Sequence, residues 1–373
     1  MKREVPLIHI VAATQDYEAW LARFFPLHAP DLAFKRERMA DPNDPFPFFR
    51  GTYYRWPAVW AATCPELVSA PRVAGVGDLH VENFGTWRDV DGRLCWGVND
   101  FDEADEIPYT SDLVRLAASA RLARKSGALD IKTSDACRVI LDGYRDALAA
   151  GGTPFVLEEH HPDLRTVGMA SERAPIRFWA KLTKLLDEPV IDPPPAARDA
   201  LVRELPSDAR APAFRFRARA GMGSLGRPRF VALVEWRGGW MCREAKAIAP
   251  PATEWAAGTA EPATSKLAEV VERAVRAPDP FYRVEGGWVL RRLAPRCSRI
   301  ELDHLKKIDT GRVLTAMGAE TANVHLGTPG AASAVLRHVV RLPAGWLERA
   351  AKDAAAAVER DWQAWRQARN SKG

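Results

Sequence analysis

Two short stretches, Gly77–Gly85 (GDLHVENFG) and Asn99–Glu103 (NDFDE), decide the predicted fold of this chain. Both concentrate acidic, amide and imidazole side chains, and each follows an apolar run that predicts a short strand, at residues 73–76 and 94–98. An Asp-Gly pair at 91–92 is typical of a hairpin turn. We therefore expect two strands joined by a turn, with the two polar stretches brought together at one end.

This end of the hairpin would gather oxygen ligands. Carboxylate and amide oxygens suit a hard cation such as Mg²⁺. In protein kinases an Asp base is followed five positions later by an Asn that holds metal, and an Asp-Phe motif further along also holds metal. Here Asp78 and Asn83 are five positions apart, and Asp100 precedes a Phe. We predict that Asp78 is the base and that Asn83 and Asp100, with Asp102, hold the metal.

The sequence motif of the first stretch also resembles that of known phosphotransferases. Residues 78–83 resemble the Asp-Leu-Lys-x-x-Asn string of protein kinases, with His80 at the lysine position. The Gly-Asp-Leu-His opening is closer to the aminoglycoside and choline phosphotransferases. The resemblance implies a catalytic group made of Asp78, His80, Asn83 and Asp100. The alternative is a surface hairpin with acidic tips.

A glycine-rich stretch at 219–226 predicts a phosphate-covering loop. It contains Gly221, Gly223, Ser224 and Gly226, and β-rich runs follow it at 230–236 and 240–246. A dinucleotide-binding motif would need a helix after the glycines, whereas the phosphate-covering loop of kinases joins two strands. Because glycine has no Cβ, such a backbone can approach phosphate groups closely.

A cation on the second of these strands should reach the phosphates, and there are two candidates. Arg243 lies 17 positions after Gly226, the interval usual for the kinase lysine, and Lys246 lies 20 positions after it. Strand alternation places the two on opposite faces. Glu272, or Glu269, on an amphipathic helix predicted at 265–277 could pair with the cation or simply face solvent.

Three other residues have expected roles near these loops. Arg50, in an aromatic cluster, needs an anionic partner, which could be Asp78, Glu82 or a phosphate. Ser111 or Asp112 would cap the helix that follows the second stretch, and Asp112 resembles the Asp that braces the catalytic loop in kinase-like folds. His325 is expected to be a packed core histidine.

The kinase elements occur here in a rearranged order. The catalytic and metal loops lie at 78–112, and the glycine loop and cation strand follow at 221–246, with helices predicted at 303–326 and 344–368. Joining the two chain ends would restore the kinase order, and permutation is tolerated where termini lie at the surface close together. We expect an α+β, two-lobed, circularly permuted kinase-like fold. Residues 1–205 would form the catalytic-loop half of a helical lobe, 206–298 an inserted β-rich nucleotide-binding lobe, and 299–373 the helices that complete the helical lobe.

The motifs together resemble a bacterial family called domain of unknown function 2252. The resemblance covers most of residues 35–330 and includes both polar stretches, the glycine loop and Asp279-Pro280-Phe281. The family usually has Lys-Glu-Ala where this chain has Arg243-Glu244-Ala245. The resemblance implies the fold, since the family name carries no activity, and the arginine puts efficient ATP turnover in question.

Composition limits the alternatives. The chain has 373 residues, 53 basic and 48 acidic, for a net charge of +5. This mild excess suits an anionic ligand such as a nucleotide but is too diffuse to indicate nucleic acid. Five cysteines without a CxxC pair indicate neither a zinc site nor a disulfide framework, so a reducing cytoplasm is expected. No apolar run is long enough to span a membrane, and the N-terminus does not resemble a signal peptide.

The leading hypothesis is therefore an ATP- and Mg²⁺-dependent phosphotransferase acting on a hydroxyl or amine of a small molecule or protein. A nucleotide-binding pseudokinase that regulates a partner and an enzyme that transfers a nucleotidyl group are the alternatives. A two-metal phosphoesterase is disfavoured because the further His/Asp clusters that such a site needs are missing from the sequence. The sequence indicates neither the acceptor nor the oligomeric state.

Overall fold

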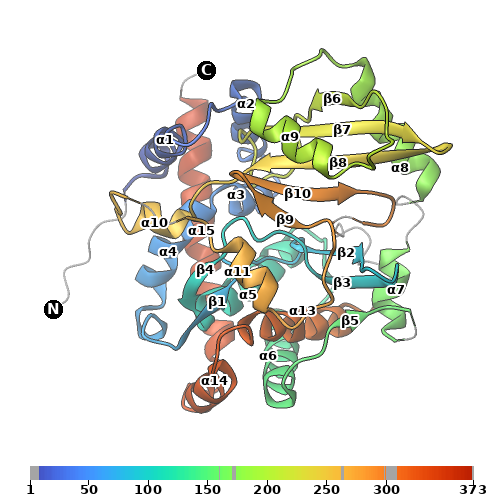
Figure 1. Ribbon diagram of the computed structural model, residues 1–373. Helices are drawn as coiled ribbons and strands as arrows, with labels where there is room; N and C mark the ends of the chain where they lie inside the picture. The colour runs from blue at the N-terminus through green and yellow to red at the C-terminus, as the bar shows by residue number, and fades with distance from the viewer. Residues whose placement is uncertain are drawn as a thin grey trace.

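The computed structural model describes residues 8–158, 160–169, 174–261, 264–297, 299 and 309–371. The chain is mixed α and β. A five-stranded antiparallel sheet lies at one side of a larger, mainly helical body, and two small sheets lie between them (Figure 1). Residues 303–308, the beginning of one expected helix, lie outside the described residues.

The five-stranded sheet lies within the stretch expected to form the β-rich lobe. Its strand order is β6-β7-β8-β10-β9, with bounds β6 Ala213–Phe216, β7 Arg229–Trp236, β8 Gly239–Ala247, β9 Arg283–Glu285 and β10 Trp288–Leu293. Arg237 and Gly238 both have positive φ, as a two-residue hairpin turn between β7 and β8 requires. Helix α9 (Pro195–Arg203) covers one face, where Leu201 packs among Ala232 and Ala245.

Alternation along β8 separates its side chains into two sets. Ala245 and Ala247 lie on the face covered by α9. Cys242 packs on the other face, near α8 (Pro175–Leu182). Glu244 and Lys246 share the face of Cys242, because residues two apart in a strand point the same way. This second face is therefore the one that turns toward the polar loops.

The hairpin between the polar stretches differs in part from the sequence-based expectation. Its strands are β2 (Phe84–Arg88) and β3 (Leu94–Val98), and β5 (Phe155–Val156) adds to it. The strand at residues 73–76 is β1 (Arg72–Gly75), which instead pairs with β4 (Asp105–Pro108). The run Phe84–Arg88 was not predicted as a strand, because it reads as the end of a polar loop.

Helices from both ends of the chain form the helical body. Helix α6 (Thr133–Ala150) packs closely on α13 (Thr310–His325), and α5 (Tyr109–Lys125) packs on α15 (Trp346–Asn370). A Cβ on Gly143 of α6 or on Gly318 of α13 would lie 2.1 Å from a backbone oxygen of the other helix, so both sites need glycine. The N-terminal helix α1 (Ile10–Leu21) also packs on α15.

One hydrophobic core runs through this body, from Ile10 near the start of the chain to Trp365 near its end. The remaining helical elements are α2 (Ala29–Arg38), α3 (Phe46–Gly51), η1 (Tyr53–Arg55), α4 (Trp56–Thr63), η2 (Pro65–Leu67), α7 (Pro162–Gly168), η4 (Thr183–Asp187), α10 (Ala252–Ala256), α11 (Leu267–Arg273) and α14 (Ala331–Val339). No helix in the described part of the chain is long and apolar enough to cross a membrane. All five cysteines lie in the described part, where they are buried and form no disulfide.

Candidate active site

The amide of Asn83 joins the two polar loops. Its Nδ2 donates to the backbone oxygens of Asp78 (3.0 Å) and Asp100 (2.9 Å), and its Oδ1 accepts from the amide of Asp100 (2.9 Å). The side chain is therefore engaged with backbone groups. The prediction that Asn83 is a metal ligand stays a prediction, and its Oδ1 has a second lone pair besides the one that accepts from Asp100 N. In this structure Asn83 positions Asp100 relative to Asp78.

Asp112, near the start of α5, braces the loop that carries Asp78. Its carboxylate accepts from the amides of Val76 (2.7 Å) and Gly77 (3.0 Å), and Nε2 of His325 lies 3.1 Å away. The expected brace is confirmed, and so is the expectation that His325 is a buried core residue. The expected cap is wrong, because α5 begins at Tyr109 with Pro108 as its N-cap, so that Ser111 and Asp112 lie inside the helix. Gly77 itself has φ of +79°, and a Cβ there would lie 2.2 Å from the Glu103 backbone oxygen. The loop therefore needs both the brace and the glycine.

Arg115 on α5 holds Asp78 and was not predicted from the sequence. Its Nε donates to Asp78 Oδ1 (3.0 Å), and its Nη2 donates to the Phe49 backbone oxygen (3.1 Å). The guanidinium is almost fully buried and stacks on Phe49, whose ring centroid is 4.0 Å away. A possible signal was an arginine on the apolar face of the helix, one turn after Asp112. Burial raises the pKa of Asp78, and Arg115 opposes that rise.

The glycine loop closes directly over Asp78. A Cβ built on Gly223 would lie 3.2 Å from Oδ2 of Asp78 and 3.4 Å from the backbone oxygen of Arg50. Lys35 on α2 donates to the Gly223 oxygen (3.3 Å). The loop and Asp78 are therefore neighbours in space, although Gly223 lies 145 positions after Asp78 in the sequence.

Lys246 is the strand cation that reaches the loop carrying Asp100 and Asp102. Its Nζ lies 3.2 Å from Asp100 Oδ1 and 2.5 Å from Asp102 Oδ1, and the lysine is buried. Partial burial opposes ionisation of Asp100, but the Lys246 ammonium outweighs it and holds the Asp100 pKa well below its usual range. Burial and the neighbouring Asp100 charge raise the pKa of Asp102. Such divergent pKa values are typical of paired carboxylates at functional sites.

Asp102 has unused acceptor capacity. Besides Lys246, Arg227 approaches it at 3.6 Å, but neither contact has hydrogen-bond geometry, and both carboxylate oxygens are buried without a donor among the described residues. A buried carboxylate that pairs with cations but accepts no hydrogen bond, next to Asp100, could also hold a divalent cation. No cluster of three His, Cys, Asp or Glu side chains arranged for a metal occurs in the described part of the chain. Mg²⁺, however, is often held by one or two carboxylates together with substrate phosphates.

Two buried ion pairs tie the ends of the glycine loop to their surroundings, and neither was predicted. Arg229 donates to Ser224 Oγ (2.7 Å) and to Glu244 Oε1 (3.2 Å), which links the loop to β8. Arg227, immediately after Gly226, donates to Glu103 Oε1 (2.6 Å). The loop is thus anchored to the sheet on one side and to the metal loop on the other.

Arg243 and Glu272 do not take part in this cluster, which corrects two predictions. Arg243 lies on the face of β8 opposite Lys246, donates to the backbone oxygens of Glu204 and Cys242 (both 3.1 Å) and stacks on Phe281. The interval after the glycines favoured Arg243, but strand alternation allows only one of the two cations to face the loops. Glu272 is exposed on α11.

His80 and Arg50 have supporting positions. The Nδ1 of His80 accepts from the Glu82 amide (3.1 Å), and burial lowers the pKa of the imidazole well below its usual value. A neutral histidine in this position shapes the loop. Arg50 pairs with Glu82, one of its expected partners, and Arg299 also contacts Glu82 (3.2 Å).

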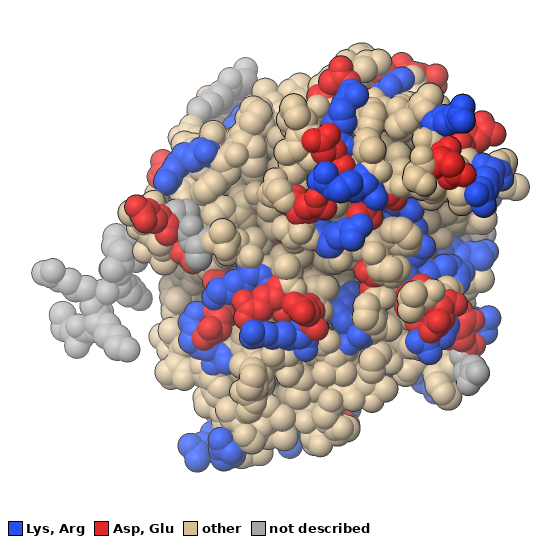
Figure 2. Space-filling model, viewed as in Figure 1, with Lys and Arg blue, Asp and Glu red and all other residues tan. Residues whose placement is uncertain are grey.

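The surface around the site is mixed in charge. On the face shown in Figure 2, acidic and basic side chains are interspersed over β8 to β10 and α11. One such pair is Arg203 with Glu285, and another is Arg273 with Glu269 (2.7 Å). This face presents no single-sign stripe of the kind that binds a nucleic-acid backbone.

Comparison with known proteins gives one match. Residues 29–184 match the model of a family described as an uncharacterized protein conserved in bacteria, domain of unknown function 2252. The matched stretch includes both polar loops and α5 but ends before the glycine loop. No curated protein and no solved structure matches the chain. The family description names no activity, so the function has to be argued from the site itself.

Proposed function

We propose that this protein is an ATP- and Mg²⁺-dependent phosphotransferase with a circularly permuted kinase-like fold. The observation that carries the proposal is the convergence of Lys246, Asp100 and Asp102, with the glycine loop folded over Asp78. These are the elements that kinases use to seat a nucleotide, its metal ion and a general base. The packing of α1 on α15 supports the permutation, because the two ends of the chain meet in one helical body.

Each residue of the site would have a distinct part. Asp78 would accept the proton of an acceptor hydroxyl or amine through Oδ2, since Arg115 occupies Oδ1. A carboxyl whose pKa is raised by burial is a better base near neutral pH than an exposed one. Asp100 and Asp102 would hold Mg²⁺, which when bound would neutralise phosphate charge. Lys246 would then turn from the carboxylates toward phosphate oxygens.

The glycine loop must lift for a nucleotide to enter. Gly223 lies too close to Asp78 for a phosphoryl group to fit between them in this conformation. The contacts that hold the loop down are the hydrogen bond from Lys35 and the Arg227–Glu103 pair. Opening would keep the Arg229–Ser224 link, since Arg229 begins β7 of the five-stranded sheet and Ser224 lies in the glycine loop just before it.

Two alternatives remain, and product analysis distinguishes both from phosphotransfer. The pseudokinase alternative arose because an arginine, Arg243, stands where the family usually has a lysine. Since Lys246 rather than Arg243 faces the carboxylates, the arginine is a weaker argument against ATP turnover. Nucleotidyl transfer would use the same groups but release pyrophosphate instead of ADP. Because the acceptor is unidentified, we infer only its chemical class.

The test combines nucleotide binding with product analysis. Mg·ATP should raise the melting temperature, and ADP should form when hydroxyl and amine acceptors are supplied. Asp78→Asn should keep binding and lose turnover, whereas Lys246→Met should weaken binding and Arg243→Met should not. Pyrophosphate release would favour nucleotidyl transfer, and binding without any product would favour the pseudokinase. If Mg·ATP neither stabilises the protein nor is consumed, the proposal is wrong.

A further inference from the structure

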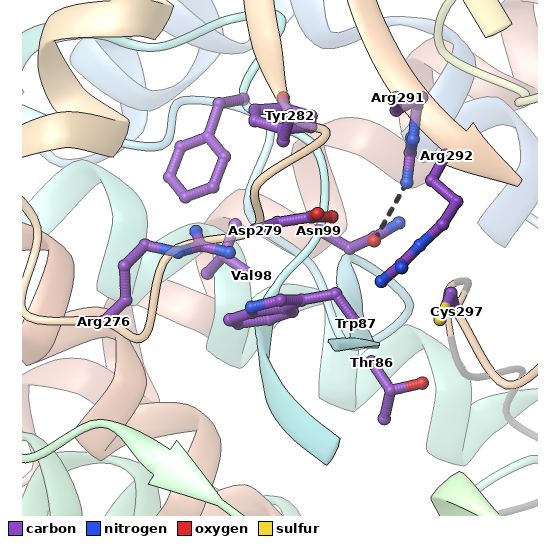
Figure 3. Close-up of a pocket in the computed structure, with 11 residues that line it drawn as sticks. Thr86, Trp87, Val98, Asn99, Arg276, Asp279, Tyr282, Arg291, Arg292 and Cys297 are labelled. Atoms are coloured by element: carbon purple, nitrogen blue, oxygen red, sulfur yellow. Dashed lines mark hydrogen bonds between the residues drawn. The ribbon is translucent and has the colours of Figure 1, made fainter. Parts of the chain in front are cut away.

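A second contact joins the five-stranded sheet to the loop that carries Asp100, beside the contact from Lys246. Nη2 of Arg291 on β10 donates to Oδ1 of Asn99 at 3.0 Å, and Figure 3 shows this hydrogen bond as a dashed line. A guanidinium group only donates hydrogen bonds, so the oxygen of the Asn99 amide is the atom that faces it. Arg291 and Lys246 therefore contact consecutive residues of one loop.

Strand pairing places these two cations on the same face of the sheet. Strand β10 pairs antiparallel with β8, and Arg291 lies directly opposite Glu244. Residues directly opposite each other in neighbouring strands share a face, and Glu244 shares its face with Lys246, two positions further along β8. The loop is therefore held at two points by side chains from adjacent strands.

Both partners of the second contact are fixed by their own surroundings. Burial opposes the charge of Arg291, but the fully buried Glu244 carboxylate attracts the guanidinium and raises the pKa of Arg291. On the other side, the backbone amide of Asn99 donates to the backbone oxygen of Asn83 (2.9 Å). The Arg291–Asn99 hydrogen bond therefore connects the sheet, through Asn83, to the loop that carries Asp78.

The two contacts differ in how they would respond to a nucleotide. Lys246 contacts the carboxylates of Asp100 and Asp102, the groups proposed to hold Mg²⁺, so a bound metal ion would displace it. Arg291 instead contacts a neutral amide outside that pair of carboxylates. Its hydrogen bond uses no metal-holding oxygen and is therefore compatible with a bound metal ion and phosphates.

We propose that Arg291 is a positioning residue that, through Asn99, keeps Asp100 in place relative to the sheet while Lys246 moves from the carboxylates to phosphate oxygens. The effect on turnover rests on the proposed phosphotransfer, whereas the restraint of the loop does not. Residues that orient a metal-holding group without touching the metal typically change metal affinity by about 10–100-fold when they are replaced.

Hydrogen exchange of the full chain tests the restraint without any ligand. The backbone amide of Asp100 bonds to Asn83, so its protection factor reports local opening of this loop. Asn99→Ala changes no charge and should lower that protection factor by about tenfold, both in the parent and in Lys246→Met. Arg291→Met should have the same effect, and combining it with Asn99→Ala should add little, because both remove one interaction.

Arg292→Met is the matched control, because it removes the neighbouring cation, whose Nη2 donates to the Arg88 backbone oxygen (3.1 Å) instead. It should leave the Asp100 protection factor unchanged.

ATP consumption over a Mg²⁺ titration tests the effect on turnover. Asn99→Ala should raise the Mg²⁺ concentration that gives half-maximal rate by about tenfold. A merely structural role would lower the fraction of active protein and leave that concentration unchanged. The proposal is overturned if Asn99→Ala and Arg291→Met keep the Asp100 protection factor of the parent, if Arg292→Met lowers it as much, or if Asn99→Ala keeps the Mg²⁺ requirement of an active parent. If the parent consumes no ATP while Asn99→Ala and Arg291→Met still lower the protection factor, the phosphotransferase proposal fails and the restraint of the loop by Arg291 is supported.

Discussion

Lys246 Nζ lies 3.2 Å from Oδ1 of Asp100, although 146 positions separate the two residues in the chain. The ammonium also contacts Asp102, so one buried cation balances two carboxylates. This relationship joins the five-stranded sheet to the loop after β3. In the proposed phosphotransferase, a metal ion and Lys246 would compete for the same carboxylate oxygens.

The first prediction concerns the loss of that cation. Lys246→Met leaves Asp100 and Asp102 without their shared partner, and we expect a loss of about 3–5 kcal/mol in the free energy of unfolding without metal. Millimolar Mg²⁺ should restore part of that loss, since it would occupy the same oxygens. Urea unfolding with and without Mg²⁺ measures both effects.

Arg243→Met is the matched control for Lys246→Met. It removes a cation from the same strand but from the opposite face, so its stability should not depend on Mg²⁺. Equal responses of the two variants to Mg²⁺ would contradict the assignment of Asp100 and Asp102 as the metal-holding pair.

The second prediction concerns the brace under the loop that carries Asp78. Asp112→Ala removes the acceptor of two buried amides and the partner of His325, and we expect it to cost about 3–5 kcal/mol. Asp112→Asn keeps one acceptor oxygen and should cost roughly half as much. Thermal and urea unfolding of both variants tests the order, and a smaller effect for Ala than for Asn would show that the carboxylate is not the brace.

Local spacing in the sequence predicted much of the site. Asp78 and Asp100 lie in short loops whose residue spacing matches the kinase motifs. Asp112 lies near the start of a helix that the sequence predicts. These groups meet because Asn83 bonds to both loops, an interaction within 17 positions of chain. The bracing role of Asp112 could therefore be predicted from the sequence alone.

Contacts between segments far apart in the chain could not be predicted from local spacing. Choosing Lys246 over Arg243 required the exact register of β8, because an odd shift along a strand exchanges its two faces. Arg115 is hidden in an apolar helix, and its partner lies 37 positions away. Arg227 and Glu103 are 124 positions apart, so no local pattern connects them.

The third prediction concerns Gly226, at the end of the glycine loop. It has φ of +97°, and a Cβ there would lie 2.4 Å from Cδ2 of Leu32. Gly226→Ala should therefore destabilise the protein by about 1–3 kcal/mol through backbone strain and a clash. Gly239→Ala is the control, because a Cβ on Gly239 meets open space, and it should change stability by less than about 0.5 kcal/mol. Equal melting temperatures for the two variants would contradict the observed loop conformation.

The fourth prediction is a pH dependence that arises from Lys35, which holds the glycine loop. Burial lowers the pKa of Lys35 from 10.5 to about 8. Between these values the unfolded chain binds more protons than the folded chain, so this residue makes stability rise with pH. Below pH 8 both states are protonated, and the cost of burying the charge is fully present, at most about 3 kcal/mol.

Lys35→Met should remove this rise. Urea midpoints of the parent and the variant, compared from pH 7 to pH 10.5, should show Lys35→Met with the smaller increase across the window. Lys125→Met is the control, since Lys125 is exposed and pairs with Glu359 at the surface. If the parent and Lys35→Met keep a constant difference over that range, Lys35 does not titrate as its burial requires, and its charge is not buried under the glycine loop in solution.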